Sequence, residues 1–406
     1  MMKKKVLFIS DHGDPLARLG GKQSGGQNNY VKQLALALDG LGISVDVVTH
    51  WSNPNTPQIE AFGENCRVIR VAAGHKGYMN KSEMINILPA FYREMQDVIP
   101  INTYDIVHSH YWISGLLGLI IKNNYEIPLV HTSHSLGIAK YRGTGKKETT
   151  RLHAEKNILR KADTVIATTT NEKKLIESFA GPKANVVVSS IGVNRDIFYP
   201  YVRKKRQSVP VFSFAGRLEE TKGIVTLLNA FNKLNAQING DIKLIVAGGD
   251  EDEVDLTTFE PKKKELKEAV RGIEDKVMFV GSKTQEELAD IFNRSTAVVV
   301  PSYYESFGMV AAEAQACGTP VIASGVGGLQ NVVSDGYTGI HVEPKNPDHL
   351  LKAMSILSKD IYLAKELGKQ AADYSHKAFN WEKIVKQMNM TYERLVATNE
   401  LVHASY

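Results

Sequence analysis

Short apolar runs alternate with segments of helical periodicity along most of this chain. Residues 5–10 predict a buried strand, and a polar segment rich in glycine continues from there to Gln27. Residues 28–41 carry apolar side chains at the spacing of an amphipathic helix, and residues 45–49 predict the next strand. A strand, a glycine-rich loop, a helix and a strand in this order are typical of the start of a doubly wound α/β domain.

The same alternation continues in two series. In the first, further strands are expected at 68–71, 106–110, 129–131, 164–168 and 186–188, and helices at 86–99, 116–122 and 150–162. In the second, strands are expected at 211–214, 242–247, 277–280, 297–300 and 321–323, and helices at 224–234, 261–271, 285–293 and 309–316. One more amphipathic helix is expected over residues 380–395. This alternation predicts two tandem, doubly wound α/β domains with parallel sheets.

The length of the chain agrees with that division. With 406 residues it exceeds what one ordinary hydrophobic core organises. We place the domains at residues 1–200 and 201–378, followed by a last segment at 379–406. The net charge of +5 fits an anionic small substrate or, at most, peripheral contact with a membrane surface. No dense basic stripe indicates a nucleic acid partner.

Two features bear on the compartment. Cys66 and Cys317 have neither the spacing of a metal site nor that of a disulfide framework, so a reduced, cytoplasmic location is expected. The basic start of the chain superficially resembles a signal peptide, but its apolar run ends at Ser10, so we expect a first strand instead. No apolar run approaches membrane-spanning length. The basic run 203–206 predicts a solvated linker in preference to a membrane-binding segment.

The stretch from Pro301 to Glu313 is a strand-to-helix turn between the elements expected at 297–300 and 309–316. A helix N-terminus carries unpaired N–H groups and partial positive charge, so this turn is an anion site. Glu305 precedes the helix and Glu313 lies about two turns into it. An anion pocket between two carboxylates suits a ligand that is part phosphate and part polyhydroxyl.

Arg217 and Lys222 flank the turn that follows the strand expected at 211–214. Each alone would be an ordinary surface charge, but together they can bind one diphosphate, Arg as a fork and Lys as a point charge. Gly327 and Gly328 would allow a further close approach of backbone to the ligand. No Asp-x-Asp pair or carboxylate cluster indicates a divalent metal, so we expect protein groups to balance the phosphate charge and no cofactor to be required.

Polar side chains also follow strands of the first series. They are His108, His110, Tyr111, His134 and Ser135. Because ligands of open α/β sheets bind beyond the carboxyl ends of the strands, their positions favour a cleft over separate structural histidines. A zinc site is the competing interpretation, but no acidic ligand lies at a helpful spacing. Within the glycine-rich loop, Gly25-Gly26 directly before the helix is the part expected to approach a ligand.

These motifs together resemble those of the family 4 retaining glycosyltransferases of the GT-B fold. The resemblance rests on Gly216-Arg217 with Lys222-Gly223, on Glu305-Ser306-Phe307-Gly308-Met309-Val310 with Glu313, and on residues 317–323 with Gly327-Gly328. It implies two Rossmann-like domains that face each other across a cleft and close to limit hydrolysis. It also implies that a closing helix after Phe379-Asn380-Trp381 returns to the N-terminal domain.

The family resemblance assigns roles to residues on the donor side. A nucleotide-diphosphate sugar, UDP-linked in our expectation, would be the donor. Arg217 and Lys222 would bind its diphosphate, Glu305 its sugar hydroxyls and Glu313 its ribose. The remaining donor residues would be Ser306, Phe307, Gly308, Met309 and Val310, with Gly26 from the N-terminal domain and His134 beside the anomeric carbon. No carboxylate is placed as the nucleophile of a retaining hydrolase, so a front-face, metal-independent transfer is implied.

The N-terminal half resembles one branch of this family more closely. Residues 24–31, 109–115 and 131–137 are similar to the branch that contains the inositol-phosphate N-acetylglucosaminyltransferase of mycothiol synthesis and sucrose-phosphate synthase. The branch implies a small phosphorylated acceptor. Its acceptor-binding residues would be Gln27, Lys81, Tyr111, Ser135, Lys140 and Arg151. Residues 142–150 form a polar, glycine-containing loop without a clear counterpart in that branch.

Three alternative functions and the oligomeric state stay open at this point. The acceptor could be unphosphorylated, a lipid or a polymer, although no long basic-aromatic face is evident. A nucleotide-sugar 2-epimerase uses the same double fold but needs acid/base carboxylates from the N-terminal domain that we do not find. A non-catalytic nucleotide-sugar-binding protein would require a damaged donor site, whereas the four donor-site charges are all present. The sequence also leaves a homodimer open.

Overall fold

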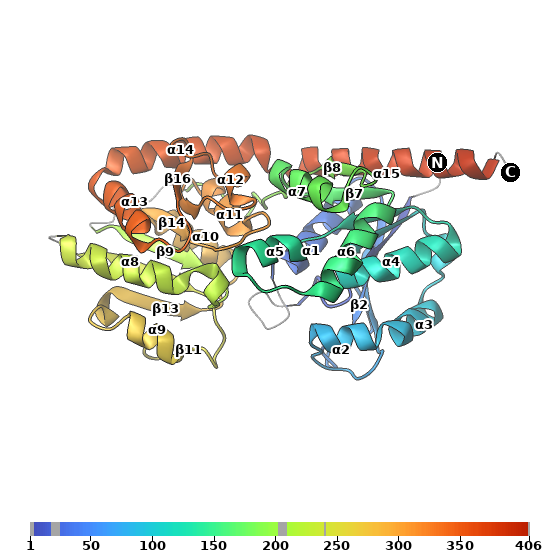
Figure 1. Cartoon of the computed structure of the whole chain (residues 1–406), viewed down its shortest axis with the longest axis horizontal. Helices are drawn as coiled ribbons and strands as arrows, with labels where there is room; N and C mark the ends of the chain where they lie inside the picture. The colour runs from blue at the N-terminus through green and yellow to red at the C-terminus, as the bar shows by residue number, and fades with distance from the viewer. Residues whose placement is uncertain (1–3, 18–24, 202–208, 239–240, 405–406) are drawn as a thin grey trace. The chain divides into compact units, whose positions relative to one another are not determined.

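The computed structural model describes residues 4–17, 25–201, 209–238 and 241–404, which form two compact units (Figure 1). The first unit contains the described residues up to Ser190 together with those from Trp381 onward, and the second contains Ile191–Asn380. Three features singled out in the sequence, namely Ser24, the pair Gly20-Gly21 and the basic run 203–206, lie outside the described residues. Each unit is an α/β layer structure, as expected.

The first unit is built on an eight-stranded sheet with the order β3-β4-β2-β1-β5-β6-β7-β8. The strands are β1 (Lys5–Ile9), β2 (Ser44–His50), β3 (Ile59–Ala61), β4 (Cys66–Val71), β5 (Ile106–His110), β6 (Leu129–Thr132), β7 (Thr164–Ala167) and β8 (Val186–Val188). All neighbours are parallel except β3, which pairs antiparallel with β4. Most strand residues are buried, as expected when helices cover both faces of a parallel sheet.

Helices cover the two faces of this sheet. They are α1 (Gly26–Asp39), α2 (Lys81–Asn86), α3 (Leu88–Val98), α4 (Trp112–Tyr125), α5 (Gly137–Thr144), α6 (Thr149–Lys161), α7 (Thr170–Ala180) and α15 (Trp381–Ala404), with a 3₁₀ turn at Ile101–Thr103. Successive side chains of β1 point to opposite faces of the sheet, so the core of this unit has two parts. Leu7 and Ile9 pack with α3, α4, α6 and α7. Phe8 points to the other face, where α1 and α15 pack on each other.

The second unit has a six-stranded, fully parallel sheet with the order β13-β10-β9-β14-β15-β16. Its strands are β9 (Val211–Ala215), β10 (Lys243–Ala247), β13 (Val277–Gly281), β14 (Ala297–Val300), β15 (Val321–Ser324) and β16 (Gly339–Val342), beside a small hairpin of β11 (Val254–Asp255) and β12 (Glu260–Pro261). Its helices are α8 (Ile224–Gln237), α9 (Lys264–Ala269), α10 (Gln285–Arg294), α11 (Met309–Ala316), α12 (Leu329–Val332), α13 (Pro347–Lys359) and α14 (Ile361–Ala378), with 3₁₀ turns at Glu220–Lys222 and Glu274–Lys276.

Two predicted helices are corrected by the structure. The helix expected at 86–99 is α3, which begins at Leu88 with Pro89 in its first turn; the separate helix α2, capped by two hydrogen bonds to Asn80, precedes it and was not expected. The helix expected at 261–271 is only α9, because Glu260–Pro261 pairs with β11 instead. The sequence analysis also missed α5, α7, α12, α13, α14, β3 and β16. Of these, α13 has a clear start signal, an Asn346 cap followed by proline.

Candidate active site

The strand order of each sheet reverses at one place, and the predicted site residues gather there. In the first unit the reversal lies between β1 and β5, and in the second between β9 and β14. Ligands of doubly wound sheets bind outside the carboxyl ends of the strands at such a point. The loops after β1 and β5 contain Asp11 and Tyr111, and those after β9 and β14 contain Lys222 and Glu305.

On the donor side, the structure brings Lys222 and Glu305 together. The Lys222 Nζ donates to the Glu305 Oε2 at 2.6 Å, and the Ser302 hydroxyl donates to the same oxygen at 3.3 Å. Both charged side chains are partly exposed, 24% for Lys222 and 19% for Glu305. Arg217 does not join them: its side chain is 67% exposed and its Nη1 lies 2.7 Å from the Glu219 Oε1. Arg217 and Lys222 therefore do not lie together in this conformation, and their shared role at a diphosphate stays a prediction.

Close backbone packing holds these turns, and it explains several glycines. A Cβ on Gly223 would lie 2.1 Å from the Pro301 carbonyl oxygen, and one on Gly327 would lie 2.2 Å from the Glu305 carbonyl oxygen. A Cβ on Gly328 would lie 2.1 Å from the Ser306 carbonyl oxygen. The pair Gly327-Gly328 thus approaches the Glu305 turn itself, not open space for a ligand as we predicted from sequence. Its role is to shape the loop that carries Glu305.

The helix α11 begins as predicted, directly after Gly308. This glycine has φ +102, a left-handed conformation that an L side chain rarely adopts. Phe307 is buried against Phe379, so its ring anchors the turn that contains Ser306. Val310 is the second residue of α11, and Met309 the first.

Glu313 lies in the buried part of α11. Burial raises the pKa of this carboxyl to about 8, and no hydrogen bond or ion pair to it is found among the described residues. A carboxyl that is protonated near neutral pH can both donate and accept hydrogen bonds, which suits the paired hydroxyls of a ribose.

On the acceptor side, Tyr111 is the centre of a cluster of predicted residues. The Lys81 Nζ donates to the Tyr111 hydroxyl at 2.8 Å, and the Arg151 guanidinium lies 5.0 Å from the centre of the Tyr111 ring. The Arg151 Nη2 donates to the Ser135 carbonyl oxygen at 2.5 Å and to the Ser135 hydroxyl at 3.4 Å. Lys81, Tyr111, Ser135 and Arg151, which come from four separate segments, therefore lie in one place. We call these four residues the cationic cluster.

A buried carboxylate, which the sequence analysis did not identify, supports this cluster. Glu155 accepts a hydrogen bond from the Arg151 Nε at 2.7 Å and two from the Gly137 N–H at 2.8 and 3.0 Å. Arg151 and Glu155 side chains are only 4% and 1% exposed. A carboxylate four residues after an arginine is common on exposed helices, so its spacing gave no signal of this role. Lys140, the third predicted cation, reaches the cluster only through Glu148, which it contacts at 2.6 Å.

The backbone at this edge is strained at two predicted residues. Tyr111 has φ +78 and ψ +159, and His134 has φ +55, although neither is glycine. Such conformations cost about 1–3 kcal/mol each and concentrate at functional sites. His134 contacts His110 through ring nitrogens 3.0 Å apart. Burial, with other histidines nearby, lowers the pKa of His134 to about 3 and that of His110 well below its usual value. Both imidazoles are neutral and act as hydrogen-bonding groups.

Gln27 and Gly26 form the first turn of α1. The Gln27 amide donates to the Ser10 hydroxyl at 3.1 Å and to the His110 carbonyl oxygen at 3.4 Å. The predicted donor and acceptor residues of α1 thus lie at the carboxyl ends of β1 and β5.

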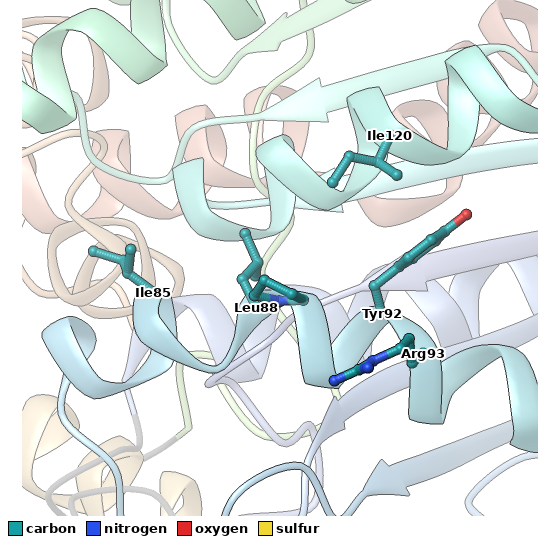
Figure 2. Close-up of a pocket in the computed structure, with 6 residues that line it drawn as sticks. Ile85, Leu88, Tyr92, Arg93 and Ile120 are labelled. Atoms are coloured by element: carbon teal, nitrogen blue, oxygen red, sulfur yellow. The ribbon is translucent and has the colours of Figure 1, made fainter.

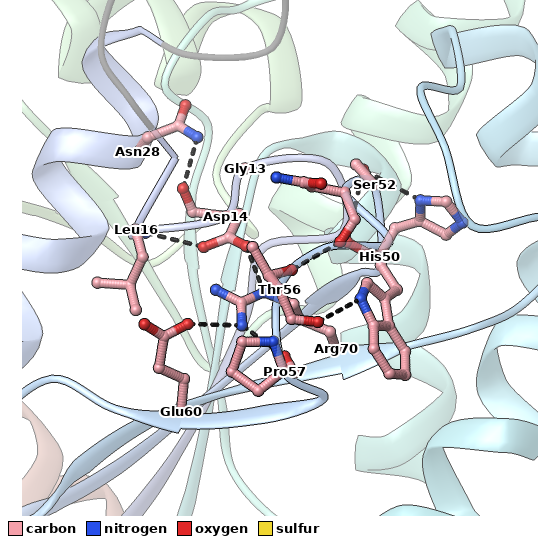
Figure 3. A network of polar contacts seen from close by, with 12 residues as sticks. Gly13, Asp14, Leu16, Asn28, His50, Ser52, Thr56, Pro57, Glu60 and Arg70 are labelled. Atoms are coloured by element: carbon pink, nitrogen blue, oxygen red, sulfur yellow. Dashed lines mark hydrogen bonds and ion pairs between the residues drawn. The ribbon is translucent and has the colours of Figure 1, made fainter.

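A buried arginine holds the residues that follow β1 (Figure 3). Arg70, 1% exposed, donates to Asp14 at 2.6 Å, to the Pro57 carbonyl oxygen at 2.6 Å and to Glu60 at 2.8 Å. The Asp14 carbonyl oxygen in turn accepts a hydrogen bond from Asn28, in the first turn of α1, at 2.8 Å. Arg70 is thereby linked through Asp14 to the first turn of α1. The sequence gave no signal for this, because Arg70 stands inside a predicted strand.

Asp11 and His12 are a second pair that the sequence analysis did not identify. Asp11 is fully buried; it accepts a hydrogen bond from the Ser114 hydroxyl, and its other carboxylate oxygen lies 2.9 Å from the His12 Nδ1. The His12 ring packs edge-on against Tyr111 with the ring centres 4.8 Å apart. Their position could have identified them, because both are polar and directly follow the strand expected at 5–10.

The described residues contain neither a metal-binding group of side chains nor a membrane-spanning helix. No group of three or more His, Cys, Asp or Glu side chains in them is arranged to hold a metal ion, so the zinc interpretation gains no support. None of their helices combines the length and apolar character that a bilayer crossing requires. A cavity of about 590 Å³ is an apolar groove between α2, α3 and α4, lined by Ile85, Leu88, Pro89, Tyr92, Arg93 and Ile120 (Figure 2). It contains none of the predicted site residues.

Comparison with known proteins places the chain in a family. Residues 25–192 match the family model of the glycosyl transferase 4-like domain, and residues 199–374 match that of glycosyl transferases group 1. D-inositol 3-phosphate glycosyltransferase of Corynebacterium glutamicum (strain R) is 32% identical over 417 residues, 98% of each chain. The chain belongs to the family 4 glycosyltransferases of the GT-B fold. The predicted family and fold class are thereby confirmed.

Other members agree with this placement of the glycosyltransferase. The D-inositol 3-phosphate glycosyltransferase of Mycobacterium avium (strain 104) is 32% identical, covering 97% of this chain and 94% of that one. Sucrose-phosphate synthase from Thermosynechococcus elongatus superposes with a TM-score of 0.88 at 35% identity, covering 98% and 100%. Anabaena HepE, solved with UDP and glucose, has a TM-score of 0.72 at 19% identity, covering 96% and 100%, which shows a shared fold alone.

Proposed function

We propose that this glycosyltransferase moves a sugar from a UDP-linked donor to a hydroxyl of a small, phosphorylated acceptor in the cytoplasm, with retention of the anomeric configuration. The observation that carries the proposal is the cationic cluster of Lys81, Tyr111, Ser135 and Arg151. A lysine, an arginine and two hydroxyls at one strand edge make a cradle that fits a phosphate monoester. Curated relatives along the whole chain are glycosyltransferases of D-inositol 3-phosphate, which supports the same class of acceptor.

The donor would be bound by the turns after β9 and β14. Lys222 would contact the diphosphate, and Glu305, now paired with it at 2.6 Å, would accept hydrogen bonds from the sugar hydroxyls. Arg217 is exposed and can turn from Glu219 to the diphosphate at little cost, since exposed ion pairs contribute at most about 1 kcal/mol. Glu313, largely protonated near neutral pH, would bind the ribose.

The proposed reaction is a front-face substitution. The bond between the anomeric carbon and the leaving phosphate oxygen breaks, and the acceptor oxygen bonds to the same face of that carbon. The acceptor proton passes to the leaving phosphate, so no enzymatic nucleophile is needed. Lys222 and Arg217 would stabilise the charge that develops on the diphosphate, a task for which preorganised groups suffice without a metal ion. Neutral His134 would hydrogen-bond beside the sugar without adding charge.

The test is a donor and acceptor panel read by mass spectrometry. UDP-, ADP- and GDP-sugars are crossed with D-inositol 3-phosphate, hexose 6-phosphates and the same polyols without phosphate. We expect a glycoside of a phosphorylated acceptor from a UDP-sugar, with the same rate after treatment with EDTA. Transfer to unphosphorylated acceptors alone would contradict the acceptor class. An epimerised nucleotide sugar from donor alone would contradict transfer itself.

A further inference from the structure

The segment that runs from the second half of α5 to the first turn of α6 is rich in positive charge. Between residues 140 and 151 the chain has five basic side chains and a single acidic one. The basic residues are Lys140, Arg142, Lys146, Lys147 and Arg151, and the acidic one is Glu148. Such a segment attracts anions, and its one carboxylate occupies a particular place in it.

Glu148 binds the two cations of this segment that are predicted to hold the acceptor phosphate. Its Oε1 accepts a hydrogen bond from the Lys140 Nζ at 2.6 Å, and its Oε2 lies 3.5 Å from the Arg151 Nη1. The carboxylate also stands at the start of α6, where it makes no capping hydrogen bond to the backbone. Burial raises the pKa of Glu148, but the hydrogen bond and charge of Lys140 and the charge of Arg151 outweigh it, so the pKa is lowered and the group is ionised.

The contact resembles the one that a phosphate would make. A carboxylate presents two oxygens to a lysine and an arginine, as two oxygens of a phosphate monoester do. Glu148 differs from Glu155, the other carboxylate on Arg151, in its exposure. The Glu148 side chain is 43% exposed, whereas that of Glu155 is 1% exposed and also accepts from Gly137. Glu155 is therefore fixed in the core, and Glu148 is free to leave.

We propose that Glu148 is an intramolecular competitor that occupies the phosphate subsite of the empty enzyme and is displaced by the acceptor phosphate. The inference rests on the proposed function, since it needs Lys140 and Arg151 to bind an acceptor phosphate. Displacement costs the enzyme the Glu148 contacts, so the affinity for phosphorylated ligands is lower than the cations alone would give. Ligands without phosphate cannot displace it, and Glu148 thereby contributes to selection of the acceptor.

Removing the charge of Glu148 leaves the rest of the subsite in place. Arg151 keeps its hydrogen bonds to Glu155 and to the Ser135 carbonyl oxygen, at 2.7 and 2.5 Å, when Glu148 is replaced. Gln has the size of Glu and no net charge, so Glu148→Gln tests the competition with little change in shape. A partly exposed ion pair of this kind is worth a factor of about two to five in binding, after allowance for solvent screening.

The experiment measures dissociation constants by calorimetry at fixed ionic strength. Inorganic phosphate, D-inositol 3-phosphate and glucose 6-phosphate are titrated into the wild type and into Glu148→Gln, with unphosphorylated inositol for comparison. We expect the variant to bind phosphorylated probes about two to five times more tightly and to bind inositol as the wild type does. The control is Glu177→Gln, because Glu177 pairs with Lys173 at 3.7 Å on α7 and is 49% exposed. It changes the net charge equally and should leave all affinities unchanged.

Equal or weaker binding of phosphorylated probes by Glu148→Gln would overturn the competition. A second variant separates that failure from failure of the proposed function. Lys81 is exposed, and Lys81→Met removes one cation of the cluster without leaving a buried charge. If Lys81→Met weakens binding of D-inositol 3-phosphate but Glu148→Gln does not strengthen it, only the competitor role is wrong. If no phosphorylated probe binds the wild type, the phosphorylated acceptor is wrong and the competitor role falls with it.

Discussion

Replacing Lys222 by methionine should abolish most of the activity while leaving the fold nearly unchanged. The ammonium group of Lys222 lies 2.6 Å from the Glu305 carboxylate, at the end of the turn after β9. In the proposed reaction it stabilises the negative charge that grows on the leaving diphosphate. Methionine keeps the length and apolar stem of the side chain and removes only the charge and the hydrogen-bond donors.

This substitution should have a small effect on stability and a large effect on kcat. Lys222 and Glu305 are 24% and 19% exposed, so neither charge is fully desolvated and the loss of the pair should cost about 1 kcal/mol in stability. For a unit of this size that corresponds to a change in Tm of about 2–4 °C. The loss of one preorganised electrostatic contact to a transition state costs a factor of about 100–1,000 in kcat. The effect on catalysis should therefore exceed the effect on folding by far.

The assay compares kcat from product formation with Tm from circular dichroism for the same preparations. Lys233→Met is the matched control, because Lys233 lies in the same unit and pairs with Asp348 at 2.7 Å on the surface, away from the turns. Lys233→Met should keep the wild-type kcat. If Lys222→Met keeps more than about one tenth of the wild-type kcat, Lys222 does not carry the role we assign to it.

Three further predictions follow from buried charges. Arg151→Ala should raise the KM for the acceptor and leave the KM for the donor unchanged. The substitution is combined with Glu155→Gln, because the buried carboxylate of Glu155 would otherwise lose its partner and destabilise the variant. Unchanged acceptor kinetics would refute the role of Arg151. Arg70→Met should lower the free energy of unfolding by about 3 kcal/mol, because Asp14 and Glu60 lose their partner. Denaturant titration measures this change. A loss below about 1 kcal/mol would show that the ion pairs of Arg70 are dispensable for stability. The pKa of Glu313 is about 8 in the folded protein against 4.5 as its ordinary value, so the folded state holds a proton that the unfolded state has lost between these pH values. Stability contributed by this group is full below about pH 4.5 and falls as the pH rises towards 8, by at most about 1.4 kcal/mol per pH unit; Glu313→Gln should remove that dependence, and identical pH profiles would contradict the burial argument.

The sequence was sufficient to predict the architecture of both units. Apolar runs identified twelve of the strands, because strands covered on both faces are almost wholly apolar. The elements it missed have weaker signals. The hairpin of β11 and β12 has only two residues in each strand, and its pairing depends on contacts with β13. Helix α7 begins with a Thr169 cap but has fewer apolar residues than α8, so its composition gave a weaker signal.

For the site, motifs predicted the residues but not their partners. Lys222, Glu305 and Glu313 stand where a strand-end turn and a helix start must place them. Arg217 and Lys222, five positions apart, did not come together, because the Arg217 side chain lies at the surface with Glu219. The carboxylates of Glu155, Glu148 and Asp11 were missed because nothing in their spacing shows which cation or hydroxyl the fold brings to them.

The conformation of Tyr111 shows why the cationic cluster could not be derived from residue types alone. With φ +78 and ψ +159 the residue occupies a region that normally requires glycine, at a cost of about 1–3 kcal/mol. The surroundings hold it there: its N–H donates to the Thr132 carbonyl oxygen at 2.9 Å, and its carbonyl oxygen accepts from Gly115 in α4 at 2.9 Å. A relaxed backbone would carry the phenol away from Lys81 and Arg151. β6 and α4 thus maintain a conformation that places the Tyr111 hydroxyl 2.8 Å from the Lys81 Nζ and the Tyr111 ring against the Arg151 guanidinium, a placement that no residue type predicts by itself.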